Sequence, residues 1–310
     1  MTTGKKLGPN SHDTISSFIL TTLLMKTLLI FGVGLIGGSI ALKVREKKLY
    51  ESIIGVARDG GTNLEHLVGS RMLDSVSNNL NEDIKNADFI IIATPVAQIG
   101  PILAKIYPYL SKNTLITDVG STKLDVIHEA RAHLKDKFNQ FVGSHPIAGS
   151  EKHGAIVAQK DLFVNKNIII TNEKEANFNQ TKLLSEFWGE MGGIVTIMSA
   201  NEHDKIFSTV SHLPHLLAFN LVNLINNKKN KGTLLKFAAS GFRDFSRIAA
   251  SSPEMWRDIS LANKEAILSD LSLFQNEIAT LIKLIELNDN QGLEDYLANA
   301  SMTRKNWINN

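Results

Sequence analysis

Cysteine is absent from the 310 residues of this chain. Its absence excludes disulfides, zinc fingers, iron–sulfur clusters and thiol nucleophiles. The chain also lacks an excess of one charge, because 33 Lys and Arg stand against 31 Asp and Glu, for a net charge of +2. This near balance argues against a nucleic-acid-binding protein that depends on a broad basic surface.

Long apolar runs are missing as well. No segment reaches the roughly 18 uninterrupted apolar residues that a membrane helix needs, so we expect no membrane partner. Residues 15–24 are apolar and weakly resemble a signal peptide, but they have no clear small-residue cleavage site, and Lys26 interrupts the run. We therefore expect residues 1–24 to be an extension outside the fold, Met25 to be the more natural start, and the protein to be soluble and cytoplasmic.

Length and composition predict two folded domains. Hydrophobic residues make up 43% and charged residues 21%, as in ordinary globular proteins, and 310 residues suit two domains of about 150 each. In the first half, short apolar strands alternate with helices, which predicts an α/β fold with a doubly wound parallel sheet. The strands are expected at residues 27–31, 52–57, 89–93, 114–118, 141–144 and 168–171.

After about residue 175 the strand pattern nearly stops, apart from residues 194–197. Residues 206–225 are apolar almost all round, which predicts a helix buried on most sides and kinked at Pro214. A second helix carries an apolar stripe that could be core or a helix–helix dimer surface. The stripe consists of Ile267, Leu271, Phe274, Ile278, Leu281 and Ile285. We predict an all-helical substrate and dimerisation domain at residues 176–310.

A glycine-rich segment follows the first expected strand and opens a helix. It reads Gly32-Val33-Gly34-Leu35-Ile36-Gly37, a complete G-x-G-x-x-G in the strand–turn–helix context that dinucleotide binding requires. The first glycine allows the tight turn, the second lets the backbone approach a pyrophosphate, and the third lets the helix pack on the strand. The alternative is a glycine turn without a ligand. We predict a dinucleotide-binding, Rossmann-type domain at residues 25–175.

The end of the second strand bears on the choice of cofactor. An acidic residue about 20 positions beyond the motif would bind the ribose of NAD. Ala57 holds that position and Arg58 follows, which favours NADP modestly because a guanidinium pairs well with phosphate. Asp59 leaves NAD open. Thr94 and Pro95 end the third strand and are expected to border the nicotinamide ribose, although Pro95 could equally mark a simple turn.

Five further motifs stand in order along the chain. They are DVGSTK at 118–123, GSHPIAGSE at 143–151, SHLPH at 211–215, GFRDFSRIA at 241–249 and MWRDI at 255–259. The first two each follow a strand, so both should lie at the carboxyl edge of the sheet, where ligands bind. From Lys26 onward, with these motifs in this order, the chain resembles the prephenate/arogenate dehydrogenase family of tyrosine biosynthesis.

The resemblance implies an NAD- or NADP-dependent oxidative decarboxylation of prephenate to 4-hydroxyphenylpyruvate, or of arogenate to tyrosine. It also implies a homodimer joined through the helical domain. His145 matches the family's catalytic base, and Ser121 matches the serine that hydrogen-bonds this histidine and the substrate hydroxyl. Arg247 matches the substrate arginine, His215 a second substrate contact, and Glu151 an acidic residue at the pocket mouth. A histidine suits the role of base, since it titrates near neutral pH.

Single residues allow other interpretations. His145 could be a turn histidine with purely structural contacts. His212 and His215 could form a metal pair, but only His203 and Asp204 upstream could complete it, so we expect no metal and a structural His212. Arg243 and Arg247 could instead pair with Asp244 or Asp258 in a surface network.

Two other functions remain as alternatives. A β-hydroxyacid dehydrogenase would carry a lysine on the first long helix of the second domain, but residues 206–225 contain His212 and His215 and no lysine. A non-catalytic dinucleotide-sensing protein would keep the glycine motif but would not need His145, Ser121 and Arg247 together.

Overall fold

The computed structural model describes residues 25–57, 64–149, 154–171 and 178–308. The predicted extension at residues 1–24 lies outside them. The chain divides into two compact units. The first comprises the described residues up to Asp204 together with 250–262, and the second comprises 205–249 and the residues from Asn263 onward.

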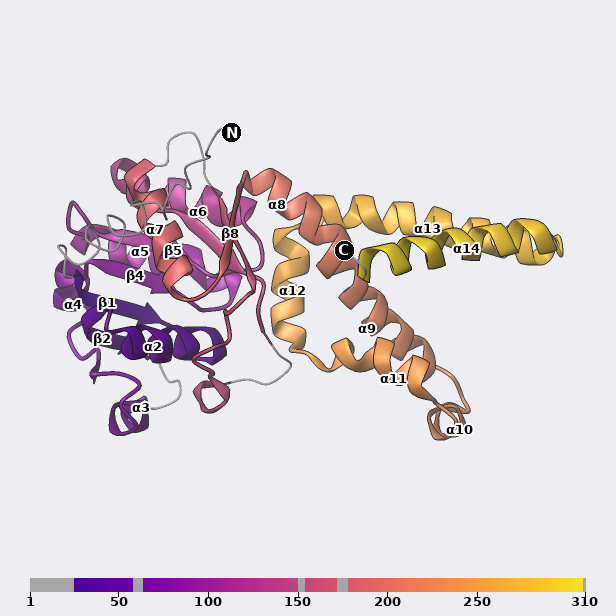
Figure 1. Ribbon diagram of the computed structural model, residues 1–310, viewed down its shortest axis with the longest axis horizontal. Helices are drawn as coiled ribbons and strands as arrows, with labels where there is room; N and C mark the ends of the chain where they lie inside the picture. Colours follow the sequence, from indigo (N-terminus) through magenta and orange to yellow (C-terminus); the bar gives the residue numbers. More distant parts are fainter. Residues whose placement is uncertain (1–24, 58–63, 150–153, 172–177, 309–310) are drawn as a thin grey trace, which may run out of the picture. The chain divides into compact units, whose positions relative to one another are not determined.

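The first unit is built on a five-stranded sheet in which all neighbouring strands are parallel. The order is β3-β2-β1-β4-β5 (Figure 1). The strands are β1 (Met25–Phe31), β2 (Tyr50–Val56), β3 (Ser75–Val76), β4 (Phe89–Ile92) and β5 (Leu115–Asp118). Every residue of β4 and β5 is buried, as expected for strands covered on both faces. The predicted α/β, Rossmann-type fold is confirmed.

The side chains of β1 point alternately to the two faces of the sheet, and each face has its own hydrophobic core. Leu28 and Ile30 face one core, which contains residues of α2 (Leu35–Lys47), whereas Leu29 and Phe31 face the other, which contains residues of α5 (Ile99–Ile106) and α6 (Leu124–Leu134). Two short helices complete the alternating part of this unit, α3 (Glu65–Gly69) and α4 (Leu80–Asn86). The strand order reverses direction between β1 and β4, which is the switch point where such sheets bind ligands.

A second sheet in the same unit has the order β6-β7-β8. Its strands are β6 (Gly143–Pro146), β7 (Asn167–Thr171) and β8 (Ile194–Met198). β6 runs antiparallel to β7, so the expectation of a wholly parallel arrangement is wrong for this pair. The described part of the β6–β7 connection contains only the short 3₁₀ helix η4 (Ala155–Val157) and not the α-helical crossover that usually joins parallel strands. The helix α7 (Phe178–Glu190) provides such a crossover to β8, which is parallel to β7.

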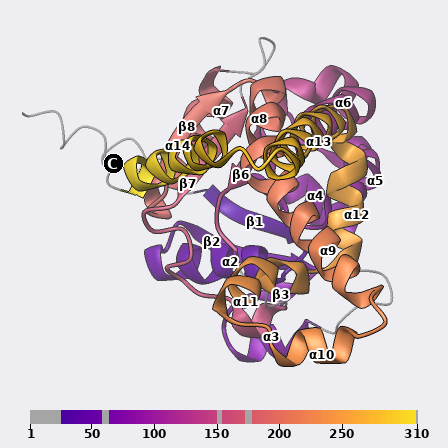
Figure 2. The ribbon, with the colours of Figure 1, turned by 90° about the vertical axis from the view of Figure 1, so that its right-hand side faces the viewer.

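The second unit is helical in its described residues. Its helices are the end of α8 (Ala200–Phe207), α9 (Leu213–Asn226), α10 (Lys231–Lys236), α11 (Ser240–Ser246), α13 (Lys264–Glu286) and α14 (Asn290–Ile308), while α12 (Pro253–Ala262) belongs to the first unit. α13 and α14 lie side by side as an antiparallel hairpin (Figures 1 and 2). None of the described helices combines the length and hydropathy needed to cross a bilayer.

The predicted helix over residues 206–225 is not continuous. A π-helical turn, Ser208–His212, separates α8 from α9, and Pro214 lies in the first turn of α9, where its missing N–H is tolerated. The expected burial on most sides is also wrong for the single chain. Ala218 is the one buried residue in α9, and Leu224 is 53% exposed, because the other helices of the unit cover only part of its surface.

Candidate active site

The three motif glycines meet different surroundings. Gly32 has φ +84°, and a Cβ there would lie 2.6 Å from the carbonyl oxygen of Ala93. A Cβ on Gly37 would overlap the carbonyl oxygen of Gly32, so this glycine lets α2 pack against the end of β1. A Cβ on Gly34 would meet no atom within 4 Å. The first and third glycines are therefore needed by the turn itself, while the second faces open space.

The amino terminus of α2 can accept an anion. Gly34 is the N-cap and supplies no side-chain hydrogen bond, and the first turn contains no acidic residue. The backbone amides at Leu35, Ile36 and Gly37 thus begin a helix whose positive dipole end has no built-in counter-charge. This arrangement fits the pyrophosphate of a dinucleotide.

Thr94 and Pro95 begin one residue beyond the end of β4 and lie beside the glycine turn. The Cβ position of Gly32 is 3.0 Å from Cγ2 of Thr94, so the loops after β1 and β4 meet at the switch point. The hydroxyl of Thr94 is buried and has no hydrogen-bond partner among the described residues. Because a buried hydroxyl without a partner is costly, this group suits a ligand hydrogen bond. Arg58 and Glu151, predicted for cofactor and substrate, lie outside the described residues.

The loop after β5 is held at both ends. The carboxylate of Asp118 accepts the Gly120 amide at 2.7 Å and forms an ion pair with Lys123, and both charged side chains are fully buried. Burial raises the pKa of Asp118, while the charge of Lys123 acts in the opposite direction. Ser121 lies in the middle of this loop and is partly buried. Its predicted contact with His145 stays a prediction.

His145 lies in β6, next to the end of β5. The hydroxyl of Ser144 donates to the Asp118 carbonyl at 2.7 Å and lies 3.1 Å from the hydroxyl of Thr117, which ties the two strands together. The amide of Val142 donates to the Ile116 carbonyl at 2.9 Å, where the chain runs parallel to β5. His145 therefore lies at the same carboxyl edge as the glycine turn and Thr94.

Two residues that sequence reasoning missed stand behind His145. Nδ1 of His145 is 2.8 Å from Nε2 of His203, and Nδ1 of His203 is 2.7 Å from a carboxylate oxygen of Asp204. The Asp204 carboxylate also accepts the backbone amides of Lys123 at 2.8 Å and Leu124 at 2.9 Å, at the start of α6. The sequence placed His203 and Asp204 together only as weak metal ligands. Because 58 residues separate the two histidines, nothing in the sequence indicated that they are in contact.

In the second unit, the structure brings His215 and Arg247 together. Nδ1 of His215 donates to the Ser211 carbonyl at 2.9 Å. Burial lowers the pKa of His215, and the positive charge of Arg247 lowers it further, although the hydrogen bond to Ser211 acts against both. His215 is thus neutral near pH 7. The pair thus places a guanidinium and an imidazole near each other in the second unit.

The other candidate residues have partners of their own. His212 is buried and accepts a hydrogen bond at Nδ1 from the side-chain amide of Asn263 at 3.2 Å. Asp258, considered as a partner for Arg243 and Arg247, binds Arg257 at 2.6 Å. Arg243 is exposed.

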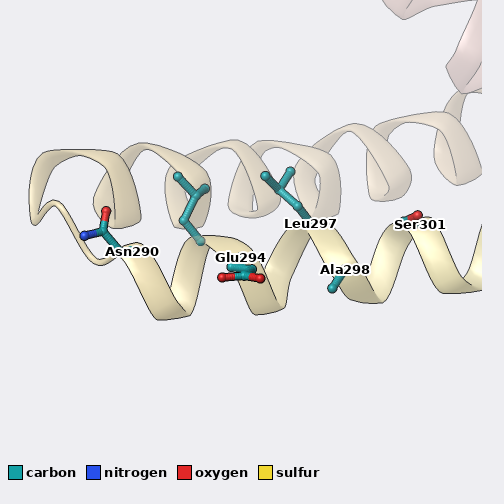
Figure 3. A pocket seen from close by; sticks show the side chains of 6 residues that line it. Asn290, Glu294, Leu297, Ala298 and Ser301 are labelled. Atoms are coloured by element: carbon teal, nitrogen blue, oxygen red, sulfur yellow. The ribbon is translucent and has the colours of Figure 1, made fainter.

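A shallow pocket lies along α14, and Figure 3 shows the side chains that line it. They are Asn290, Leu293, Glu294, Leu297, Ala298 and Ser301. None of the predicted site residues is among them. The pocket therefore does not coincide with the groups that could perform catalysis.

Comparison with known proteins adds an independent line of support. Residues 40–197 match the family model "Prephenate dehydrogenase, nucleotide-binding domain", and residues 199–299 match "Prephenate dehydrogenase, dimerization domain". The prephenate dehydrogenase of Bacillus subtilis is 38% identical, over 88% of this chain and 74% of that protein. The cyclohexadienyl dehydrogenase of Zymomonas mobilis is 30% identical, over 90% and 95%.

A solved structure gives the same result. Prephenate dehydrogenase from A. aeolicus, crystallised with hydroxyphenyl propionate and NAD+, superposes with a TM-score of 0.85 at 33% identity, over 92% of this chain and 99% of that one. The two family models together span most of the chain, in the order of its dinucleotide-binding and helical parts. With its glycine turn and its partly buried histidine at one edge of the sheet, this chain belongs to the prephenate dehydrogenase family.

Proposed function

We propose that the protein is an NAD(P)-dependent prephenate dehydrogenase, which converts prephenate to 4-hydroxyphenylpyruvate in tyrosine biosynthesis. One observation carries the proposal: His145 lies at the same sheet edge as the glycine turn and Thr94. A base and a dinucleotide are thus brought to one place. The relatives named prephenate dehydrogenase and the A. aeolicus complex with NAD+ support it.

The reaction requires few protein groups. Prephenate loses a hydride from its carbinol carbon and carbon dioxide from its ring carboxylate, and the ring becomes aromatic. The nicotinamide, when bound, accepts the hydride. His145 accepts the proton of the substrate hydroxyl as the hydride leaves, and then returns a proton to the phenol oxygen. Ser121 is proposed to hydrogen-bond His145 and that hydroxyl.

The substrate carries two carboxylates and therefore needs cations. Arg247 is proposed to bind one of them, because a guanidinium pairs with a carboxylate through two parallel hydrogen bonds. His215 is proposed as a second substrate contact, and Glu151 as an acidic group at the mouth of the pocket. Arogenate differs from prephenate only in an amino group on the side chain, and it is the alternative substrate.

For the cofactor we propose NADP ahead of NAD. Ala57 follows β2 in the position where an acidic residue would bind the NAD ribose, and Arg58 comes next. The proposal is tested by measuring kcat/KM for prephenate and arogenate, each with NAD and with NADP. A higher kcat/KM with NAD would contradict the cofactor choice, and a higher value with arogenate would contradict the choice of substrate.

We also propose a homodimer formed through the helical unit, in the cytoplasm. The matching dimerization-domain model supports the dimer. Apolar residues on α13 that are open in the single chain support it too, among them Ile278, Ile282 and Ile285. The cytoplasmic location stays a prediction.

Replacing the proposed base tests the assignment directly. In His145→Asn we expect kcat with prephenate to fall by about 100-fold to 10,000-fold, because general-base catalysis contributes that much. KM should change little, and NAD(P)H formation gives the rate. His133→Asn, which changes a partly exposed histidine paired with Glu129 on α6, is the control and should keep full activity. A His145→Asn enzyme with wild-type kcat would refute the assignment.

A further inference from the structure

We propose that His203 and Asp204 are positioning residues that hold the base His145 in its active tautomer. The inference rests on the proposed function, because it requires His145 to be the base. Neither residue needs to touch the substrate. The inference follows from a chain of three hydrogen-bonded side chains, His145–His203–Asp204, which we refer to as the histidine relay.

The direction of the hydrogen bonds begins at Asp204. An ionised carboxylate only accepts, so Nδ1 of His203 must carry the proton that it shares with Asp204 at 2.7 Å. In neutral His203 the other nitrogen, Nε2, then has a lone pair and accepts. Nδ1 of His145, 2.8 Å away, must therefore donate. This leaves the lone pair of His145 on Nε2, where it can accept the substrate proton.

Burial makes this assignment persistent. The side chain of His203 is completely buried, and that of Asp204 is nearly so. A charged His203 would lose hydration on burial, whereas the neutral form satisfies both neighbours. Once His145 takes up a proton, its Nδ1–H still points at the lone pair of His203, and the carboxylate beyond it favours the positive charge. The relay thus stabilises the protonated base as well as orienting the neutral one.

Asp204 also fixes the loop that carries Ser121. Its carboxylate accepts the amides of Lys123 and Leu124, so it caps α6 from 80 residues away. The other end of this loop is held by Asp118, through the Gly120 amide. The carboxylate of Asp204 therefore helps to set the position of the base, through His203, and the position of Ser121, through the start of α6.

The test is the isosteric change Asp204→Asn in the full-length enzyme. An amide that donates to Nδ1 of His203 forces the proton onto Nε2 of His203, and hence the lone pair of His145 onto Nδ1. The Nε2 of His145 then carries a proton and cannot act as base. We expect kcat to fall by about 100-fold or more, with KM little changed, as when a catalytic histidine is locked in the wrong tautomer.

Asp88→Asn is the matched control. Asp88 also accepts two consecutive backbone amides, those of Lys26 at 2.7 Å and Thr27 at 2.9 Å, but it lies before β4, at the opposite edge of the sheet. We expect both variants to lower the Tm and only Asp204→Asn to lower kcat. A parallel loss of kcat in the two variants would show that Asp204 acts through stability alone and would overturn the proposal.

Nitrogen-15 NMR of histidine-labelled wild-type enzyme decides the point even if Asp204→Asn does not fold. We expect neutral His145 to carry its proton on Nδ1, and a proton on Nε2 would overturn the relay. The outcomes also separate the two proposals. If wild type does not oxidise prephenate, the proposed function fails. If wild type is active, His145→Asn is inactive and Asp204→Asn keeps kcat within about threefold, only the relay fails.

Discussion

At the scale of single residues, two glycines of the motif are required by the fold, and the third leaves space for a ligand. Gly32 and Gly37 are surrounded by backbone atoms that leave no room for a Cβ. Gly34 has open space beside it, at the amino end of α2. The same residue type is thus required for two physical reasons, and substitution distinguishes them.

Gly34→Ala should fold like wild type and bind the dinucleotide poorly, since the added methyl occupies the space that a pyrophosphate would use. Gly37→Ala should lose both stability and binding, because its Cβ overlaps the Gly32 carbonyl and pushes α2 from the sheet. We expect the Tm of Gly34→Ala to match wild type and that of Gly37→Ala to fall. Calorimetry with NADP gives the affinities. Unchanged affinity in Gly34→Ala would contradict a pyrophosphate at this turn.

The positive charge of Arg247 should have a measurable effect on the pKa of His215. In Arg247→Gln we expect the pKa of His215 to rise, yet to stay below its ordinary value of about 6.5, because burial is the larger cause of its lowering. NMR titration of the full-length protein measures this. Arg243→Gln, one helical turn earlier on α11, is the control and should leave the pKa unchanged. An unchanged value in Arg247→Gln would contradict their proximity.

The same lowered pKa has a consequence for stability. The unfolded chain binds a proton at His215 more readily than the folded chain does, so this group makes stability fall as the pH drops below about 6.5. Arg247→Gln should weaken that dependence. The variant should also raise KM for prephenate by about 10-fold or more, as expected for a lost hydrogen bond to a charged group.

At the scale of elements, local patterns predicted well wherever an element is shaped by its own residues. The buried runs at β1, β4 and β5 and the glycine-to-helix turn were placed almost as the structure has them. Elements shaped by distant contacts were not. The π-helical turn at Ser208–His212 and the antiparallel course of β6 leave no periodic signature in the sequence. π-helical turns occur often at functional sites, and this one ends directly before the helix that carries His215.

At the scale of the whole molecule, the helical unit has exposed apolar surface, which is typical of an interface with a partner. On α13 only Ile267 of the predicted stripe is buried, whereas Ile278 and Ile285 are 45% and 56% exposed. The alternative of a core stripe thus holds only for the start of the helix. The remainder fits the proposed interface between two copies.

Charges placed on the exposed apolar residues of α13 should separate the copies. We expect the double variant Ile278→Glu/Ile282→Glu to sediment as a monomer at concentrations where wild type is a dimer, because an apolar interface does not tolerate buried unpaired carboxylates. Asn276→Glu adds the same charge on the opposite face of α13, where the side chain is also exposed, and should remain dimeric. A dimeric double variant would place the interface elsewhere.

The sequence by itself determined the parallel sheet, the glycine turn and the histidine at the carboxyl edge of the sheet, because each depends on residues within a few positions of one another. It also carried the family, through motifs that keep their order. Only the tertiary structure decided what stands behind that histidine. His203 and Asp204 reach His145 and the start of α6 across 58 and 80 residues, and such contacts depend on how the chain folds back rather than on any local pattern.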